Sequence, residues 1–191
     1  FNEDFLNNAY DENLFIEGHF ESERYFQDFK NEIINQFNFK NKDFYSKNKF
    51  FDEITNSNSV SICIRQNRFS EKIRNINHSD IKKSREYSLE QVRYIKKSIK
   101  IIKNKITNPK FFLWSNNFDG LNEFFPESNF VHVKNLSTLE IGNKPLLDLF
   151  LMTQAKHFIV VPSSFNWWGA YLSKNQNKVI IRPDDKNFSN F

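Results

Sequence analysis

The segment 157–170, HFIVVPSSFNWWGA, sets the architecture that we expect for this chain. Residues 158–161 are apolar and rich in β-branched side chains. The run is too short for a core helix and stops at Pro162, which is typical of a buried parallel strand. Ser163 and Ser164 follow where a helix N-cap is expected. A strand that leads directly into a helix directs backbone N–H groups at one point, which suits a phosphate or diphosphate. The same spacing also fits serines that only cap the helix, followed by core tryptophans.

Short apolar strands and helices alternate on both sides of this segment. Alternation of this kind predicts a Rossmann-type α/β fold, in which right-handed crossovers place helices on both faces of a parallel sheet. A capping box of Ser88 and Gln91 predicts the start of the long helix, and the polar segment 66–87 before it is expected to be a surface loop. The expected strands are 60–65, 111–114, 130–133, 158–161 and 179–181, and the expected helices are 88–106, 118–125, 146–155 and 165–173.

The N-terminal part has a different pattern. Helical spacing begins near Glu21, with apolar residues at four-residue steps through Phe37. The run 56–59, Asn-Ser-Asn-Ser, has the composition of a loop and is the expected domain boundary. We therefore divide the chain into a helical segment, 1–56, and an α/β domain, 57–191. Because the chain begins at Phe1 rather than Met, we expect it to be part of a longer protein.

Composition excludes several functional classes. The chain has 191 residues and a formal net charge of +4, which is too weak and too dispersed to indicate nucleic-acid binding. The lysines of 96–103 lie off the apolar stripe of their helix and predict a solvated face. The single cysteine, Cys63, fits a reducing compartment and is expected to be inert inside a buried strand. Neither a membrane-spanning run nor a signal peptide is recognisable.

The residues after each strand are the candidates for function, because ligands bind at the carboxyl ends of parallel strands. Arg65 and Arg68 follow the first strand of the sheet and could hold a diphosphate between two guanidinium groups. The alternative is a surface arginine paired with Glu71. The amides of 115–117 could bind a base edge or a ribose hydroxyl, or this run could simply cap a helix.

Other chemistries find no support in the sequence. His132 and His157 lie in strands and are expected to be buried structural residues. No cluster has metal-ligand spacing, so no metal site is predicted. Glycine-rich dinucleotide and ATP loops are absent.

Four pieces of the chain together match the pattern of a known family. They read EGHFESERYF (17–26), SVSICIRQNRF (59–69), FFLWSNN (111–117) and DLFLMTQAKHFIVVPSSFNWWGAYLSKN (148–175). In this order they resemble the α-1,2-fucosyltransferases of glycosyltransferase family 11. The resemblance extends over about residues 14–183, and the last piece is the most specific.

The resemblance implies a GT-B-like enzyme without metal or cofactor. It would transfer L-fucose from GDP-β-L-fucose to the 2-hydroxyl of a galactose-containing glycan, with inversion, in the synthesis of a cell-surface glycan or lipopolysaccharide. Residues 1–56 would then be a partial acceptor-side segment, and 57–191 the donor domain. Because no membrane anchor is recognisable, we expect a cytoplasmic enzyme, with peripheral association with a membrane left open. The donor-binding residues would be Arg65, Arg68, Ser115, Asn116, Asn117, Ser163, Ser164 and Phe165.

The first motif departs from the family pattern. Cys63 replaces a histidine, and the sequence QNR at 66–68 replaces Arg-Gly-Asp, so the acidic residue of the motif is missing. Arg68 would restore a second positive charge. The catalytic residues would be Arg65, which neutralises the donor diphosphate, and Glu71, the nearest carboxylate that could act as base. Two alternatives therefore stay open: a transferase for another nucleotide sugar, and a truncated, inactive module that binds GDP or a glycan.

Overall fold

A computed structural model describes residues 22–40, 42–70, 80–134, 144–184 and 186–189. The chain forms two compact units, 1–40 and 41–191. The described part of the first unit contains two 3₁₀ turns, Glu23–Tyr25 and Gln27–Phe29, and the helix α2, Lys30–Gln36. The helical spacing predicted from near Glu21 thus corresponds to two 3₁₀ turns and one short helix in the described residues. None of these three elements has a buried residue, so packing does not reinforce the four-residue period.

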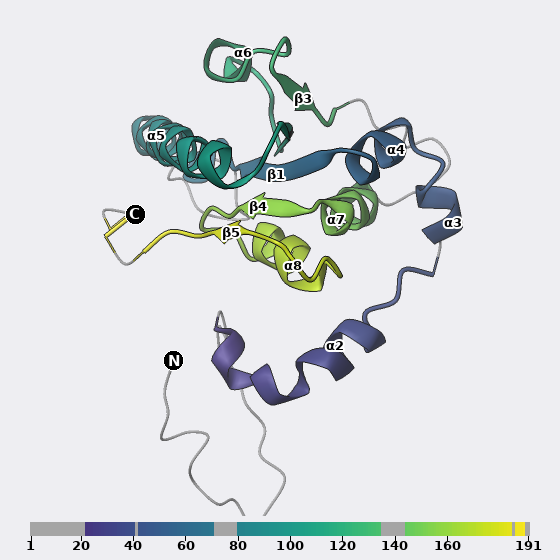
Figure 1. Cartoon of the computed structure of the whole chain (residues 1–191). Helices are drawn as coiled ribbons and strands as arrows, with labels where there is room; N and C mark the ends of the chain where they lie inside the picture. Colours follow the sequence, from purple (N-terminus) through teal and green to yellow (C-terminus); the bar gives the residue numbers. More distant parts are fainter. Residues whose placement is uncertain (1–21, 41, 71–79, 135–143, 185, 190–191) are drawn as a thin grey trace, which may run out of the picture. The chain divides into compact units, whose positions relative to one another are not determined.

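The second unit consists of alternating helices and strands (Figure 1). Its elements are α3 (Lys42–Tyr45), α4 (Lys49–Thr55), β1 (Asn58–Ile64), α5 (Ile81–Lys105), β2 (Pro109–Ser115), α6 (Leu121–Phe124), β3 (Phe130–His132), α7 (Lys144–Gln154), β4 (His157–Ile159), α8 (Ser164–Leu172) and β5 (Ile180–Ile181).

The strands form one parallel sheet in the order β3-β2-β1-β4-β5. The central strand β1 pairs with β2 along its whole length, from Asn58 opposite Pro109 to Ile64 opposite Ser115. On its other side β1 pairs with β4. The prediction of a parallel α/β sheet with helices on both faces is confirmed, and the strand order is Rossmann-like. Every predicted strand exists, with ends shifted by one or two residues.

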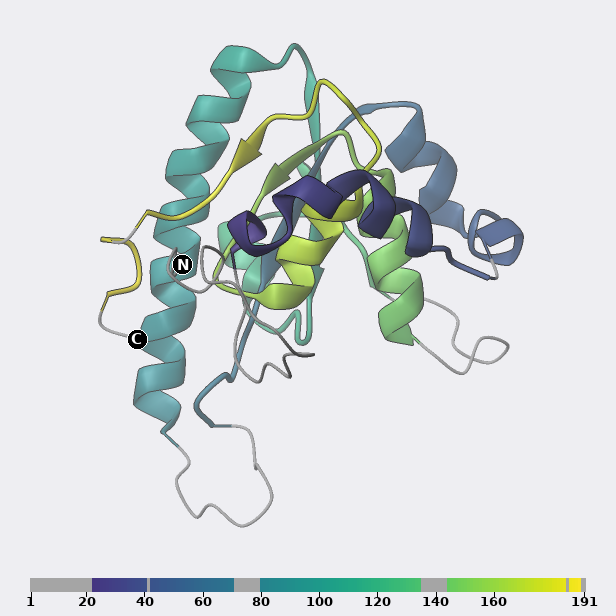
Figure 2. The ribbon, with the colours of Figure 1, turned by 90° about the horizontal axis from the view of Figure 1, so that it is seen from below.

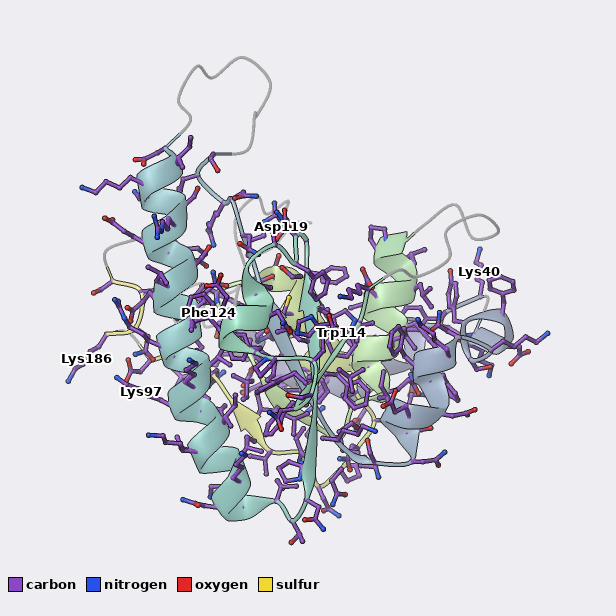
Figure 3. All side chains as sticks on the ribbon, turned by 90° about the horizontal axis from the view of Figure 1, so that it is seen from above. Lys40, Lys97, Trp114, Asp119, Phe124 and Lys186 are labelled. Carbon is purple, nitrogen blue, oxygen red and sulfur yellow. The ribbon has the colours of Figure 1, made fainter. Side chains whose placement is uncertain are left out.

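The two faces of the sheet are covered by different helices (Figure 2). Helix α5 covers one face, where side chains of β1 pack against Ile95 and Ile102 in a buried cluster. Helices α4, α7 and α8 cover the other face. There the ring of Phe150 on α7 lies 5.4 Å from that of Tyr45 and 5.8 Å from that of Phe51. Figure 3 shows Trp114 of β2 between α5 and α7, and Lys97 on the outer side of α5.

Helix α5 begins earlier than the sequence indicated, so the predicted Ser88–Gln91 capping box is wrong. The N-cap is Asp80, whose Oδ1 accepts a hydrogen bond from the backbone N–H of Lys83 at 2.7 Å. Ser88 lies inside the helix and donates to the carbonyl of Ser84 at 3.0 Å. The expected surface loop over 66–87 is therefore helical from Ile81 onward. The lysines of 96–103 are exposed, as predicted.

The loop predicted at 56–59 is also wrong in its second half, where β1 begins. Asn58 Nδ2 donates to the carbonyl of Thr107 at 2.7 Å, and the fully buried Ser59 accepts from the backbone N–H of Lys156. Polar side chains at the start of this strand are satisfied by neighbouring segments, which composition alone does not reveal. Helices α3 and α4 belong to the same compact unit as the sheet. The functional assignment of 1–56 stays a prediction.

Substitution of Gly169 is expected to destabilise the second unit. A Cβ atom at Gly169 of α8 would lie 3.0 Å from Cβ of Met152 on α7, which is closer than a Cβ atom normally approaches another atom. Gly169→Val should therefore lower the free energy of unfolding by about 1–3 kcal/mol, because one helix must move. Urea unfolding measures the change. Asn104→Val is the control, because it introduces the same β-branched residue at an exposed position of α5. An equal effect of the two variants would contradict the close-packing argument.

His157 makes the stability of the fold dependent on pH. Its imidazole is buried, and its Nδ1 accepts a hydrogen bond from the backbone N–H of Val179 at 3.1 Å. Burial, and secondarily the charge of Lys156, lower the pKa of His157 from its ordinary value of 6.5. His157 therefore binds a proton more readily in the unfolded chain than in the folded one. The stabilisation that its neutral imidazole provides is complete above pH 6.5 and is lost as the pH falls through the lower pKa of the folded state.

We therefore expect urea titrations to show that the free energy of unfolding decreases as the pH is lowered below 6.5. His157→Asn offers an amide oxygen in place of Nδ1 and does not titrate, so this variant should have a flatter profile. Identical slopes in the two proteins would contradict this assignment.

Candidate functional site

The strand order predicts a ligand-binding crevice at the carboxyl edge of the sheet. From β1 the chain crosses to β2 and β3 on one side, whereas β4 and β5 lie on the other side. The connections that follow β1 and β4 therefore leave the sheet side by side in opposite directions. This is the topological switch point at which open α/β sheets bind ligands. Two segments border it, namely the arginine loop, 65–70, and the turn 160–163 before α8.

Side-chain amides hold the first two residues of the arginine loop. Gln91 of α5 accepts a hydrogen bond from the backbone N–H of Arg65 at 3.0 Å and donates one to its carbonyl at 2.8 Å. Asn116, after β2, pairs with Gln66 in the same way, accepting from its N–H at 2.8 Å and donating to its carbonyl at 3.0 Å. The backbone N–H and carbonyl groups of Arg65 and Gln66 are thus all hydrogen-bonded, as they would be if the sheet continued.

The remainder of the arginine loop is anchored as well. Asn67 has a left-handed φ of 59°, which asparagine tolerates better than most residues, and the chain bends there. The backbone N–H of Phe69 donates to Ser84 Oγ at 2.8 Å, and its carbonyl accepts from the N–H of Asp80 at 2.9 Å. Both partners belong to the start of α5, so this helix fixes the loop at two places.

Arg68 connects the two borders of the crevice. Its Nη1 donates to the carbonyl of Pro162 at 3.1 Å and lies 3.1 Å from the hydroxyl of Tyr87. The Tyr87 hydroxyl is itself 3.3 Å from the same carbonyl. Arg68 is exposed, and Pro162 directly precedes Ser163. The structure therefore brings one predicted arginine next to the predicted serine turn.

The turn before α8 is built around a buried asparagine. Ser163 is the N-cap of α8, and its Oγ accepts from the N–H of Asn166 at 3.4 Å. Asn166 is fully buried, and its Oδ1 accepts from the N–H of Val161 at 3.0 Å. Ser164 is exposed at the first position of the helix, with the half-buried Phe165 after it. Both interpretations of the serines remain compatible with this geometry, since a capped helix start also attracts anions.

The residues after β2 form contacts with the arginine loop. The Ser115 hydroxyl donates to the carbonyl of Ile64 at 3.0 Å. The Asn117 carbonyl accepts from Gln66 Nε2 at 2.7 Å, and its side chain accepts from the N–H of Asp119 at 2.9 Å. The predicted residues 115–117 thus lie at the same edge as Arg65, and Figure 3 marks this edge with the label of Asp119.

Cys63 lies on β1, two residues before Arg65, and its side chain is half-buried. Burial, reinforced by the negative charge of Asp148, raises the pKa of its thiol to about 12, although Arg65 acts in the opposite direction. A thiol with this pKa is protonated at neutral pH and is neither nucleophile nor base. The Cys63 side chain is half-buried rather than buried, and its inertness stays a prediction.

Some site residues were missed at the level of sequence, and one predicted residue cannot be placed. Glu71, the predicted base, lies outside the described residues. Ser84, Tyr87 and Gln91 of α5 were not recognised, although all three are buried and contact the arginine loop. Their spacing of three and four residues on one helical face was the available signal.

Other kinds of site are not evident in the described part of the chain. There, no three His, Cys, Asp or Glu side chains gather as metal ligands would. None of the described helices combines the length and apolarity needed to span a bilayer. A hollow of about 770 Å³, lined by Lys103, Lys105 and Phe130 among others, lies at the amino ends of β2 and β3, the edge opposite the crevice.

The matches to known proteins all indicate glycosyltransferases. Residues 2–190 match the model of glycosyl transferase family 11. The chain is 30% identical over 170 residues to an alpha-1,2-colitosyltransferase of Escherichia coli, which covers 87% of this chain and 53% of that protein. It is 27% identical over 90 residues to an O-antigen biosynthesis glycosyltransferase of the same organism, covering 47% of this chain and 29% of the relative. The chain thus spans about half or less of these relatives. No solved structure matches significantly.

Proposed function

This chain belongs to glycosyltransferase family 11, and we propose that its crevice binds the diphosphate of a nucleotide-sugar donor as the donor half of a GT-B enzyme. The observation that carries the proposal is the convergence of the arginine loop and the capped start of α8 at the switch point. Arg68 joins the two segments through its bond to Pro162. Guanidinium groups, backbone N–H groups and a positive helix end are the features that favour a diphosphate.

The proposed reaction is inverting transfer of L-fucose from GDP-β-L-fucose to the 2-hydroxyl of a galactose-containing glycan. The acceptor oxygen forms a bond to the anomeric carbon while the bond from that carbon to the diphosphate breaks. The hydroxyl proton passes to a base, for which Glu71 is the candidate. Arg65 and the start of α8 stabilise the negative charge that develops on the departing diphosphate, so only modest base assistance is required.

Transfer of a colitosyl group is the second candidate, because the relative that covers 87% of this chain carries the name alpha-1,2-colitosyltransferase. Both candidates share an α-1,2 linkage and use the same diphosphate site. The two differ only in the sugar that the donor carries.

Titration calorimetry of the 191-residue chain with GDP, UDP and guanosine tests the donor site. We expect GDP to bind, and to bind more tightly than guanosine, because the diphosphate contributes. Absence of GDP binding by the folded protein would contradict the proposal. A donor panel with linkage analysis of the product then separates fucosyl from colitosyl transfer, and binding without turnover would favour a donor-binding module that needs further segments for activity.

A further inference from the structure

Helix α5 presents a buried row of polar side chains to the arginine loop. Ser84, Tyr87 and Gln91, here called the polar stripe, are 3%, 1% and 0% exposed. Elsewhere the inner face of α5 is mainly apolar and packs in the core cluster, with Ser98 as a further buried polar residue. A buried polar group lowers the stability of the fold unless it is hydrogen-bonded. We therefore ask what these three side chains bind.

Every member of the polar stripe contacts the arginine loop. Ser84 binds the backbone of Phe69, and Tyr87 binds the side chain of Arg68. Gln91 makes the double contact with the backbone of Arg65. From the opposite side Asn116 makes its own double contact, with Gln66. The loop is thus fixed between a helix and the neighbouring strand connection.

The two double contacts determine where the Arg65 side chain projects. A primary amide offers one acceptor and two donors, so it can pair with both the N–H and the carbonyl of one residue. Gln91 and Asn116 do this on consecutive residues and extend the hydrogen-bonding pattern of β1 beyond its last sheet residue, Ile64. Side chains alternate between faces along an extended strand, so Arg65 continues on the face of Cys63.

We infer that Gln91 and Asn116 are positioning residues for the donor diphosphate, which they serve by fixing the backbone of Arg65 and Gln66 without contacting the donor. The inference rests on the proposed function and differs from the expectation that Asn116 contacts the nucleoside. Because the backbone of Arg65 is already ordered, none of the free energy of donor binding is needed to order it.

The test compares GDP with guanosine in the 191-residue chain and the variants Gln91→Leu and Asn116→Ala. Each variant should bind GDP about tenfold more weakly, because two hydrogen bonds to one backbone residue are lost, while guanosine affinity changes less than about twofold. Asn116 is exposed, so its variant should fold even if Gln91→Leu does not. Asn104→Ala removes an exposed asparagine of α5 that lies outside the crevice, and it serves as the control with unchanged affinity.

A double-mutant cycle with Arg65→Ala separates positioning from a general loss of stability. If Gln91 and Asn116 act through Arg65, neither substitution should weaken GDP binding further in the Arg65→Ala background. Additive losses in the cycle, or an equal loss for guanosine and GDP, would overturn the inference while leaving the donor site intact. If the unmodified chain itself bound GDP no better than guanosine, the proposed function would fail instead.

Discussion

Replacing Arg65 by alanine is expected to weaken GDP binding by about a hundredfold and to lower transferase activity at least as much. The reason is that a guanidinium forms charge-assisted, paired hydrogen bonds with phosphate oxygens, in a crevice bordered by sheet and helices. Interactions of this kind with a developing negative charge contribute roughly 3–4 kcal/mol when they are prearranged. Calorimetry measures the affinity, and initial rates at saturating acceptor measure the activity.

Two further arginine variants make this prediction specific. Arg65→Lys keeps the charge but loses the paired geometry, so it should recover only part of the affinity. Arg93→Ala removes an exposed arginine on α5 that pairs with Glu90, and it should bind GDP like the unmodified chain. A loss of less than about threefold for Arg65→Ala would show that the diphosphate is bound elsewhere.

Replacing Asn166 by leucine should cause the largest loss of stability. Asn166 is 0% exposed, and its Oδ1 accepts from the backbone N–H of Val161 at 3.0 Å. Leucine has a similar size but leaves that buried N–H without its partner, which costs about 1–3 kcal/mol, and its branched end must fit a site shaped for an amide. We expect the free energy of unfolding to fall by about 3 kcal/mol in urea titration.

The control and a charged variant sharpen this test. Asn104→Leu changes an exposed asparagine and should alter the free energy of unfolding by less than about 0.5 kcal/mol. Asn166→Asp keeps the acceptor oxygen but places a carboxyl group in the core. Burial raises the pKa of such a group, so the loss of stability should grow as pH rises and the carboxylate ionises. If Asn166→Leu were as stable as the Asn104 control, the assigned hydrogen bond would not be structural.

The candidate site could be predicted in part because parallel strands share one carboxyl edge. The arginines after β1, the 115–117 run and the serine turn before α8 each follow a strand, and each does lie at that edge. Their roles in donor binding remain predictions. The contacts between them could not be predicted, because they join distant segments: Gln91 is 26 residues from Arg65, and Asn116 is 50 residues from Gln66.

The errors have a physical pattern. The capping box at Ser88 is locally plausible, but Gln91 gains more by pairing with two part-buried backbone groups of Arg65 than by capping a helix in solvent. Asn58 and Ser59 have the composition of a loop, yet partners from distant segments satisfy them in a strand. In both cases a tertiary hydrogen bond overrides a local preference.

Local patterns predicted the alternation of short apolar strands and helices, the family, and the candidate residues at the strand ends, because burial periodicity and motifs are local properties. The three-dimensional fold was needed to show that β1 lies between β2 and β4, that Arg68 contacts Pro162, and that α5 and Asn116 hold the arginine loop. Strand order and side-chain partners depend on which distant segments meet when the core closes, and the physical interactions that select them form between residues far apart along the chain.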